Sequence, residues 1–418
     1  MWKSVLSKFL STKLMIYRAL VFRFLVFGCL VFGALLFSFT SNSFAYDDVS
    51  SNNTKPRYQY NLTIDGNMSS VSSADLAMSA IESYRYVDDY VLEKYDNFLI
   101  KAAAYVSKFL VTSYIMVANH EIGGHGARAR EFNWQVTEYK VTPFSGYTNV
   151  MVPLPYHVQR IIALNLGGMQ ASHLLSEKIQ DRAFSANSIN PTYGVGYVVT
   201  RMDQLEYILG PRTMKEKLDT QSGDDVTAYV RGINYLYGPN YLTLRKLRYA
   251  TRLDLLDPFL FYSLYSYGKN SDMEIPMIKM GAVRYLPATK LVLTPYGIEK
   301  RLINHIVVGD KYFRFNLSYG NNKQKSYNAS LKTNQIINWG VYSFGTEVAL
   351  WSQPQMLIAR PVKAKVKKGG LISLQTEMPL VKDIQGLISV GYKTDGFMEG
   401  MPLEKSAMIR VGIQVNLP

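Results

Sequence analysis

The residues best suited to chemistry form one short stretch, in which two histidines flank a glutamate and two glycines: His120-Glu121-Ile-Gly-Gly-His125. Neutral imidazole is a common zinc ligand, and a carboxylate beside a zinc-bound water can accept its proton. The chain has only five histidines, so two within six positions is a marked concentration. The stretch therefore predicts a zinc site with His120 and His125 as ligands and Glu121 as the catalytic base.

The spacing of the two histidines sets a geometric condition. The pattern is H-E-x-x-x-H, one residue longer than the H-E-x-x-H of zincin peptidases. On a straight α-helix, side chains five residues apart point about 140° away from each other and could not reach one ion. One turn of π-helix returns them to one face, and Gly123 and Gly124 tolerate such a distortion. The sequence therefore predicts a π-type turn between the two histidines.

The longer pattern resembles that of the dipeptidyl peptidase III enzymes, which are zinc peptidases with an H-E-x-x-x-H motif. The resemblance covers the six motif positions, including Gly124-His125, and does not extend along the chain. It implies that His120 and His125 bind zinc and that Glu121 is the base. It also implies a third ligand, a glutamate on a second helix further along the chain.

A second predicted helix supplies candidates for that third ligand. Its Gly167-Gly168 pair would let it approach the first helix closely. Gln170, His173 and Glu177 follow at spacings of three and four, so they share one helical stripe. Ligand chemistry favours His173, whereas the resemblance favours an acidic residue and hence Glu177. We prefer His173 and keep Glu177 as the alternative, with Gln170 better suited to orienting another group.

Three protein ligands would leave the fourth zinc position for water, whose pKa would fall toward ~7. Glu121 would take its proton, and the resulting hydroxide would attack a carbonyl, most simply that of a peptide bond in a peptide or protein substrate. Arg128 and Arg130 follow His125 by about one turn. They are candidates to stabilise an oxyanion or bind a substrate carboxylate, although arginines on helices are more often solvated or ion-paired.

Two patterns of polar and apolar residues predict an α+β fold. In residues 76–272 apolar side chains recur at three- and four-residue spacing, for example in 98–109, which predicts a helical domain that contains the metal site. The resemblance of the motif implies that this domain is zincin-like. In residues 273–418 segments of alternating polarity, such as 409–417, are separated by turn clusters. This second pattern predicts an antiparallel β-domain of eight to nine strands, closed as a barrel or folded as a sandwich.

The first 75 residues predict export. Residues 1–45 contain five basic and no acidic residues, an apolar run at 24–39, and small residues around a cleavage site at Ser43-Phe-Ala45. That order is typical of a secretory signal peptide, with an uncleaved membrane anchor as the alternative. The polar segment 46–75 is predicted to be a flexible N-terminus. The single cysteine, Cys29, lies in the apolar run, so the processed chain would have no disulfide.

Charge and composition limit the partners. The formal net charge is +14, but no dense basic run beyond Lys363-Ala-Lys-Val-Lys-Lys368 and no nucleic-acid motif accompanies it, so we expect no nucleic-acid partner. The leading prediction is an exported zinc metallopeptidase in the periplasm or outer membrane of a Gram-negative bacterium. Strands of about 9–11 residues also fit an outer-membrane barrel, so the alternative is a non-enzymatic surface protein whose helical half is a plug or adaptor. A catalytically inactive form of the same fold is a third interpretation.

Overall fold

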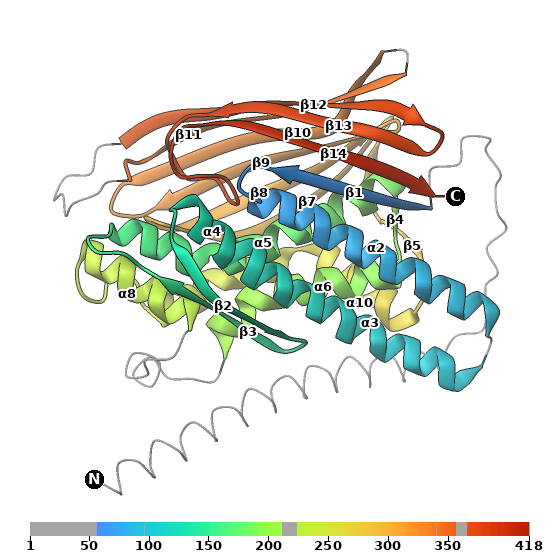
Figure 1. Ribbon diagram of the computed structural model, residues 1–418, viewed down its shortest axis with the longest axis horizontal. Helices are drawn as coiled ribbons and strands as arrows, with labels where there is room; N and C mark the ends of the chain where they lie inside the picture. The colour runs from blue at the N-terminus through green and yellow to red at the C-terminus, as the bar shows by residue number, and fades with distance from the viewer. Residues whose placement is uncertain (1–56, 96, 211–223, 340, 357–365, 418) are drawn as a thin grey trace, which may run out of the picture.

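The computed structural model describes residues 57–95, 97–210, 224–339, 341–356 and 366–417, and it combines a layer of helices with one large sheet (Figure 1). The helices are α2 (Ser70–Lys94), α3 (Phe98–Ala118), η1 (Asn119–His125), α4 (Gly126–Glu131), α5 (Val158–Ala186), α6 (Pro191–Leu209), α8 (Asp225–Tyr237), α9 (Leu244–Ala250), η2 (Thr251–Leu256) and α10 (Pro258–Lys269). The predicted α+β class, with a mainly helical first half, is confirmed. The predicted signal peptide, residues 1–45, lies outside the described residues.

One antiparallel sheet contains ten strands in the order β1-β14-β13-β12-β11-β10-β9-β8-β7-β6. They are β1 (Tyr58–Asp65), β6 (Ile278–Met280), β7 (Val283–Thr294), β8 (Gly297–Val308), β9 (Lys311–Asn321), β10 (Lys325–Trp339), β11 (Tyr342–Pro354), β12 (Val366–Val381), β13 (Ile384–Lys393) and β14 (Ser406–Leu417). Nine come from the C-terminal part, which confirms the predicted eight to nine. They form one sheet covered by helices, not the two facing sheets of a sandwich, because the helices already cover its inner face (Figure 1).

Part of the segment predicted to be a flexible N-terminus is ordered, and here the structure differs from the prediction. β1 pairs with β14 along its whole length, from Tyr58 opposite Leu417 to Asp65 opposite Arg410. The serines that follow begin α2, because Ser69 accepts a hydrogen bond from the Ser72 amide as its N-cap. The polar residues of 57–75 are therefore those of a helix N-cap and of a strand whose inner face is polar.

The motif lies on one continuous helix of 34 residues, Phe98–Glu131, formed by α3, η1 and α4. This helix is long and apolar enough to cross a membrane, but the core helices of soluble proteins can be equally long and apolar. In its most apolar 18-residue window, 22% is buried inside the protein. Lys108, which interrupts its apolar character, is buried and lies 2.7 Å from a carboxylate oxygen of Asp88 on α2. That ion pair fixes α3 against α2.

α5 is the central helix of the molecule, because its buried residues contribute to three hydrophobic clusters, two of them large. Ile162 and Leu166 pack with the buried side chains of α8 and α9. Leu175 and Ile179 pack with those of α2, α6 and α10. Both clusters hold α5 firmly against its neighbours, so the glycine pair between them faces η1 at a fixed distance. Two shorter hairpin strands, β2 (Gln135–Thr142) and β3 (Ser145–Met151), cover the motif helix from the other side.

Candidate metal centre

The motif residues Asn119–His125 form a π-helix, η1, inserted between α3 and α4. This confirms the predicted π-type turn and places both motif histidines on one face. The predicted close approach of the two glycine pairs is also confirmed. A Cβ atom added to Gly124 would lie 2.5 Å from the carbonyl oxygen of Gly167, and one added to Gly168 would lie 2.1 Å from Nε2 of His120. The glycines are needed because any side chain there would fill the space between the helices.

Three side chains converge at this face. Nε2 of His120 and Nε2 of His125 lie 3.2 Å apart, and each lies 3.1 Å from Oδ2 of Asp225, the first residue of α8. Four ligands at 2.0–2.1 Å around a tetrahedral zinc ion are separated by about 3.3 Å, so the three atoms are already spaced as three corners of such a site. Within the described part of the chain, they form the one group of this kind that could hold a metal ion.

The remaining ring nitrogen of each histidine is held by an acceptor. Nδ1 of His125 donates to the backbone carbonyl of Leu164, at 2.7 Å, since a carbonyl oxygen can only accept. Nδ1 of His120 lies 2.8 Å from Oδ2 of Asp203 on α6. Such partners fix the tautomer, orient the ring and make the other nitrogen more basic, as around most protein zinc ions. Both Nε2 atoms therefore face the common point beside Asp225.

The imidazoles and carboxylates buried together at this point shift one another's pKa values. Burial alone would lower the pKa of His120, but the Asp203 and Asp225 carboxylates raise it well above its ordinary value. The pKa of His125 is raised in the same way, chiefly by Asp225. Burial would raise the pKa of Asp225, but the two imidazoles hold it well below its usual range. The cluster thus attracts positive charge, which either protons or a metal cation can supply.

Glu121 is buried beside the cluster and is held by the β2–β3 hairpin. Its Oε2 accepts a hydrogen bond of 2.7 Å from the hydroxyl of Thr148 on β3. Gly146 on the same strand packs against it, because a Cβ there would lie 2.6 Å from Cγ of Glu121. The charge of Glu121 also helps to raise the pKa of His125, so the two groups are close enough to interact. The predicted base is therefore positioned next to the candidate ligands.

Tyr207 on α6 adds a hydroxyl group that the sequence did not single out. Its ring lies nearly parallel to that of His120, with centroids 6.1 Å apart. Burial, together with the carboxylates of Asp225, Asp203 and Glu121, raises the pKa of Tyr207 well above its ordinary value. The phenol therefore stays neutral and keeps its proton as a hydrogen-bond donor beside the cluster.

The structure does not bring the predicted third ligands to this centre. Nδ1 of His173 lies 2.8 Å from Oε1 of Glu399, a loop residue before β14. Oε2 of Glu177 accepts a hydrogen bond of 2.9 Å from Arg314 on β9. Both side chains point to the sheet side of α5, whereas its glycine pair faces η1. Asp225 occupies the third position in their place.

The two arginines of the motif helix are bound within the protein. Arg128 is buried and donates to the carbonyl of Met401 at 2.8 Å and to Oε1 of Gln170 at 2.6 Å. Arg130 donates to the carbonyls of Asn67 and Met68, each at 2.9 Å. Their contacts thus tie the motif helix to the rest of the fold, and the predicted oxyanion role finds no support in the geometry.

Asp225 was missed because its local sequence resembles a helix cap. It follows Asp224, whose Oδ1 accepts a hydrogen bond of 2.7 Å from the amide of Thr227 and so caps α8. One aspartate is enough for that purpose. The presence of a second aspartate was a signal in the sequence, but the residues around it do not show that it lies against His125, 100 residues earlier.

Comparison of the chain with protein-family models, with curated proteins and with solved structures finds no match. The site itself defines a class: a buried candidate metal centre with two histidines and one carboxylate, next to a second carboxylate. The functional argument therefore proceeds from the geometry of these residues.

Proposed function

We propose that this chain is a zinc-dependent hydrolase that cleaves peptide bonds. The observation that carries the proposal is the convergence of His120, His125 and Asp225, with all three ligand atoms 3.1–3.2 Å from one another. In this proposal the helical half is a zincin-like catalytic domain in which a π-turn accommodates the longer motif.

The residues around the centre fit the steps of hydrolysis. A bound zinc ion would polarise a carbonyl and lower the pKa of a water molecule. Glu121 would accept the proton of that water, and its hydrogen bond from Thr148 holds the carboxylate in place. We assign to the phenol of Tyr207, which keeps its proton and whose ring lies against that of His120, the donation of a hydrogen bond to the oxyanion that would develop on the attacked carbonyl.

Two histidines and one carboxylate also suit a non-haem Fe(II) centre. The neighbouring Glu121 favours hydrolysis, because a buried carboxylate next to a metal-bound water serves proton transfer. Metal analysis of protein purified without added metal distinguishes the two, and a stoichiometric iron content would replace the zinc assignment.

The hydrolase proposal is tested with Glu121→Gln. We expect this variant to bind zinc as the unchanged protein does, and its turnover of casein or short peptides to fall by about 10²–10⁴-fold, the usual contribution of a general base. Glu138→Gln changes an exposed glutamate of the β2 strand in the same way and is the matched control. A protein that binds no zinc, or a Glu121→Gln variant with full activity, would overturn the proposal.

We also propose that the chain is exported, to the periplasm or outer membrane of a Gram-negative bacterium. The support is the order of basic, apolar and small residues in 1–45. Mass spectrometry of the N-terminus in fractionated cells tests this, and we expect the mature chain to begin near Tyr46. A cytosolic chain that retains residues 1–45 would contradict it.

A further inference from the structure

The inner face of the large sheet is polar, which is the reverse of a sheet that covers an apolar core. On β9 the inward side chains are Arg314, Asn316 and Ser318, all buried. Arg314 donates to Asp181 and Glu177 of α5 at 2.9 Å each. Arg314 and Asn316 border a cavity of about 580 Å³ between the sheet and helices α2 and α5, lined mainly by polar and charged groups.

The outer face of the same strands is apolar. One outward residue from each of β9 to β14 illustrates this: Leu317, Leu331, Leu350, Ile372, Val390 and Ile409, which are between 38% and 66% exposed. β1 continues the series with Leu62 and Ile64, which pair with Ile413 and Val411 of β14. Strands that face water on one side normally place polar residues there. On these seven neighbouring strands the exposed face is apolar instead.

Charge is absent from the middle of this face and returns at its ends. Among the described residues of β9 to β14 and β1, the outward positions in register with Leu331, Ile372 and Ile409 carry no Asp, Glu, Lys or Arg. Charged side chains reappear in the turns, at Lys323 before β10 and at Asp383 before β13. A water-facing surface mixes both signs of charge with polar residues, and this one does not.

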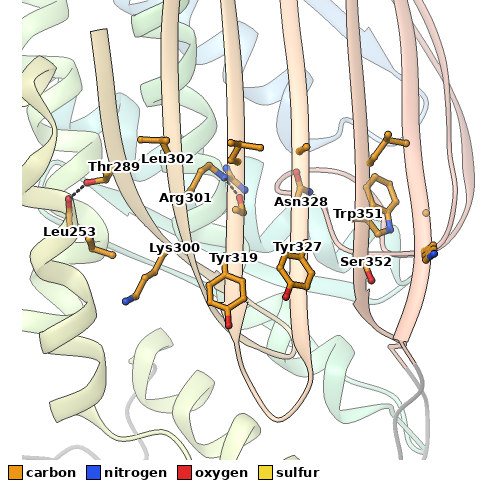
Figure 2. Close-up of a pocket in the computed structure, with 16 residues that line it drawn as sticks. Leu253, Thr289, Lys300, Arg301, Leu302, Tyr319, Tyr327, Asn328, Trp351 and Ser352 are labelled. Carbon is orange, nitrogen blue, oxygen red and sulfur yellow. Dashed lines mark hydrogen bonds between the residues drawn. The ribbon is translucent and has the colours of Figure 1, made fainter.

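Aromatic pairs mark the two ends of the apolar face. Tyr319 of β9 lies opposite Tyr327 of β10, with ring centroids 5.4 Å apart. Figure 2 shows both rings side by side with their hydroxyl groups directed toward the turn between the two strands. At the other end of β10, Trp339 lies opposite Tyr342 and is 74% exposed. Rings with one apolar and one polar end concentrate where hydrocarbon meets water.

The distance between these pairs fits a membrane. A bulge between Thr333 and Ile337 shortens β10, so the distance is counted on the facing strand β11, where ten residue steps separate Ser352 from Tyr342, or roughly 33 Å at ~3.3 Å per residue. At a strand tilt of ~35–45° this covers about 23–27 Å along the normal, close to the ~25 Å apolar band of membrane strands. Near the tyrosine pair the face also has a hollow of about 740 Å³, lined by Leu302, Leu317 and Leu350 and, at the tyrosine end, by Lys300 and Lys368 (Figure 2).

We propose that the outer face of β9 to β14 and β1 contacts the hydrocarbon core of a lipid bilayer, with the helices and the polar cavity on the side away from lipid. The occupant is lipid because the apolar area is bounded by aromatic pairs at a membrane-like spacing and has no charge between them. A second copy of the chain would need neither feature. This inference is independent of the proposed hydrolase activity, since none of its residues belongs to the candidate metal centre.

The test uses the full-length chain, purified in detergent and reconstituted into vesicles of phosphatidylethanolamine and phosphatidylglycerol. In a Cys29→Ser background, cysteines replace two neighbours on β12: Leu374, which faces outward, and Gln375, which lines the cavity. Each is labelled with a nitroxide, and collisions with oxygen and with a water-soluble nickel chelate are measured. We expect the oxygen-to-nickel collision ratio to be several-fold higher at position 374 than at 375.

A second measurement needs no substitution on this face. Brominated lipids quench tryptophans that contact acyl chains, so Trp339 should be quenched in the unchanged chain, and Trp339→Phe should remove most of that quenching. If the vesicles float and the chain stays in the soluble fraction as a monomer or dimer, the proposal is overturned. A nickel-accessible label at position 374, or tryptophan emission insensitive to bromine, would overturn it as well.

Discussion

Nε2 of His120 and Nε2 of His125 lie 3.2 Å apart, although an α-helix would direct side chains at this spacing to different faces. The π-helix Asn119–His125 removes the difference by adding one residue to a single turn. The same turn presents the Gly124 backbone to Gly167 and Gly168 of α5. The additional motif residue is thus absorbed by the backbone, and the distance between the two imidazoles suits one metal ion.

The first prediction separates the third ligand in the structure from the one expected from the sequence. Asp225→Asn keeps the shape of the side chain but removes the charge that faces both Nε2 atoms. We expect zinc affinity to fall by about 100-fold or more, since changes in the outer partners of ligands already cost 10–100-fold. His173→Gln should leave zinc affinity unchanged, because His173 contacts Glu399. Competition with a chromogenic chelator measures both, and the reverse ranking would refute the assignment of Asp225.

A second prediction concerns the space between η1 and α5. A Cβ at position 168 would lie 2.1 Å from Nε2 of His120, a distance that atoms do not adopt. Gly168→Ala should therefore displace the imidazole and abolish stoichiometric zinc binding. Gly268→Ala on α10 is the matched control, because nothing lies within 4 Å of its added Cβ. That control should leave zinc content unchanged and raise stability by about 0.5–1 kcal/mol, the helix preference of alanine over glycine. Metal analysis and thermal unfolding of both variants provide the comparison.

Local rules predicted the parts of the fold that depend on local geometry. His125 follows His120 by five residues, a spacing that requires a π-turn if both side chains are to reach one ion, and the π-turn is present. The glycine pairs at 123–124 and 167–168 predicted a close helix contact, which also exists. Alternation of polarity after residue 273 predicted the strands of the sheet, since side chains on a strand alternate between its faces.

Long-range assembly was beyond those rules. Asp203 and Asp225 join the centre from α6 and α8, and each by itself looks like an ordinary polar residue of a helix. His173 shares a helix with the correct glycine pair but faces the sheet, because residues 173 and 177 lie on another side of α5 than the glycines. Alternation also shows that a strand has two faces without showing which one is covered. The polar face proved to be the inner one.

The carboxylate behind His120 gives a third prediction. Asp203 lies 2.8 Å from Nδ1 of this ring and orients it. Asp203→Asn should lower zinc affinity by about 10–100-fold, the typical effect of losing such a partner, without removing a ligand. Isothermal titration with zinc checks this value. An affinity equal to that of the unchanged protein would show that packing alone orients His120.

A fourth prediction tests the ion pair that joins α2 to α3. Lys108→Met leaves Asp88 buried without the cation that lies 2.7 Å away, so the free energy of unfolding should fall by about 3–5 kcal/mol. The double variant Lys108→Met/Asp88→Leu removes both charges and should recover most of the loss. Lys101→Met, an exposed position on the same helix, is the control with a small effect. Denaturant unfolding of the three variants decides, and equal stability of Lys108→Met and Lys101→Met would contradict the prediction.

The last prediction concerns how the candidate base is positioned. The hydroxyl of Thr148 donates to Oε2 of Glu121 at 2.7 Å and also lies 3.1 Å from the carbonyl oxygen of Glu121. Thr148→Val keeps the branched shape and removes the donor, so Glu121 should lose its orientation while zinc binding persists. We expect kcat for peptide hydrolysis to fall by about tenfold, the cost of roughly 1.4 kcal/mol in the barrier, with KM little changed. Thr137→Val on β2 removes a comparable hydroxyl that bonds only the carbonyl of Asn149 and should leave kcat unchanged. If both variants lose activity equally, the hairpin as a whole is responsible and the Thr148 hydroxyl has no separate role.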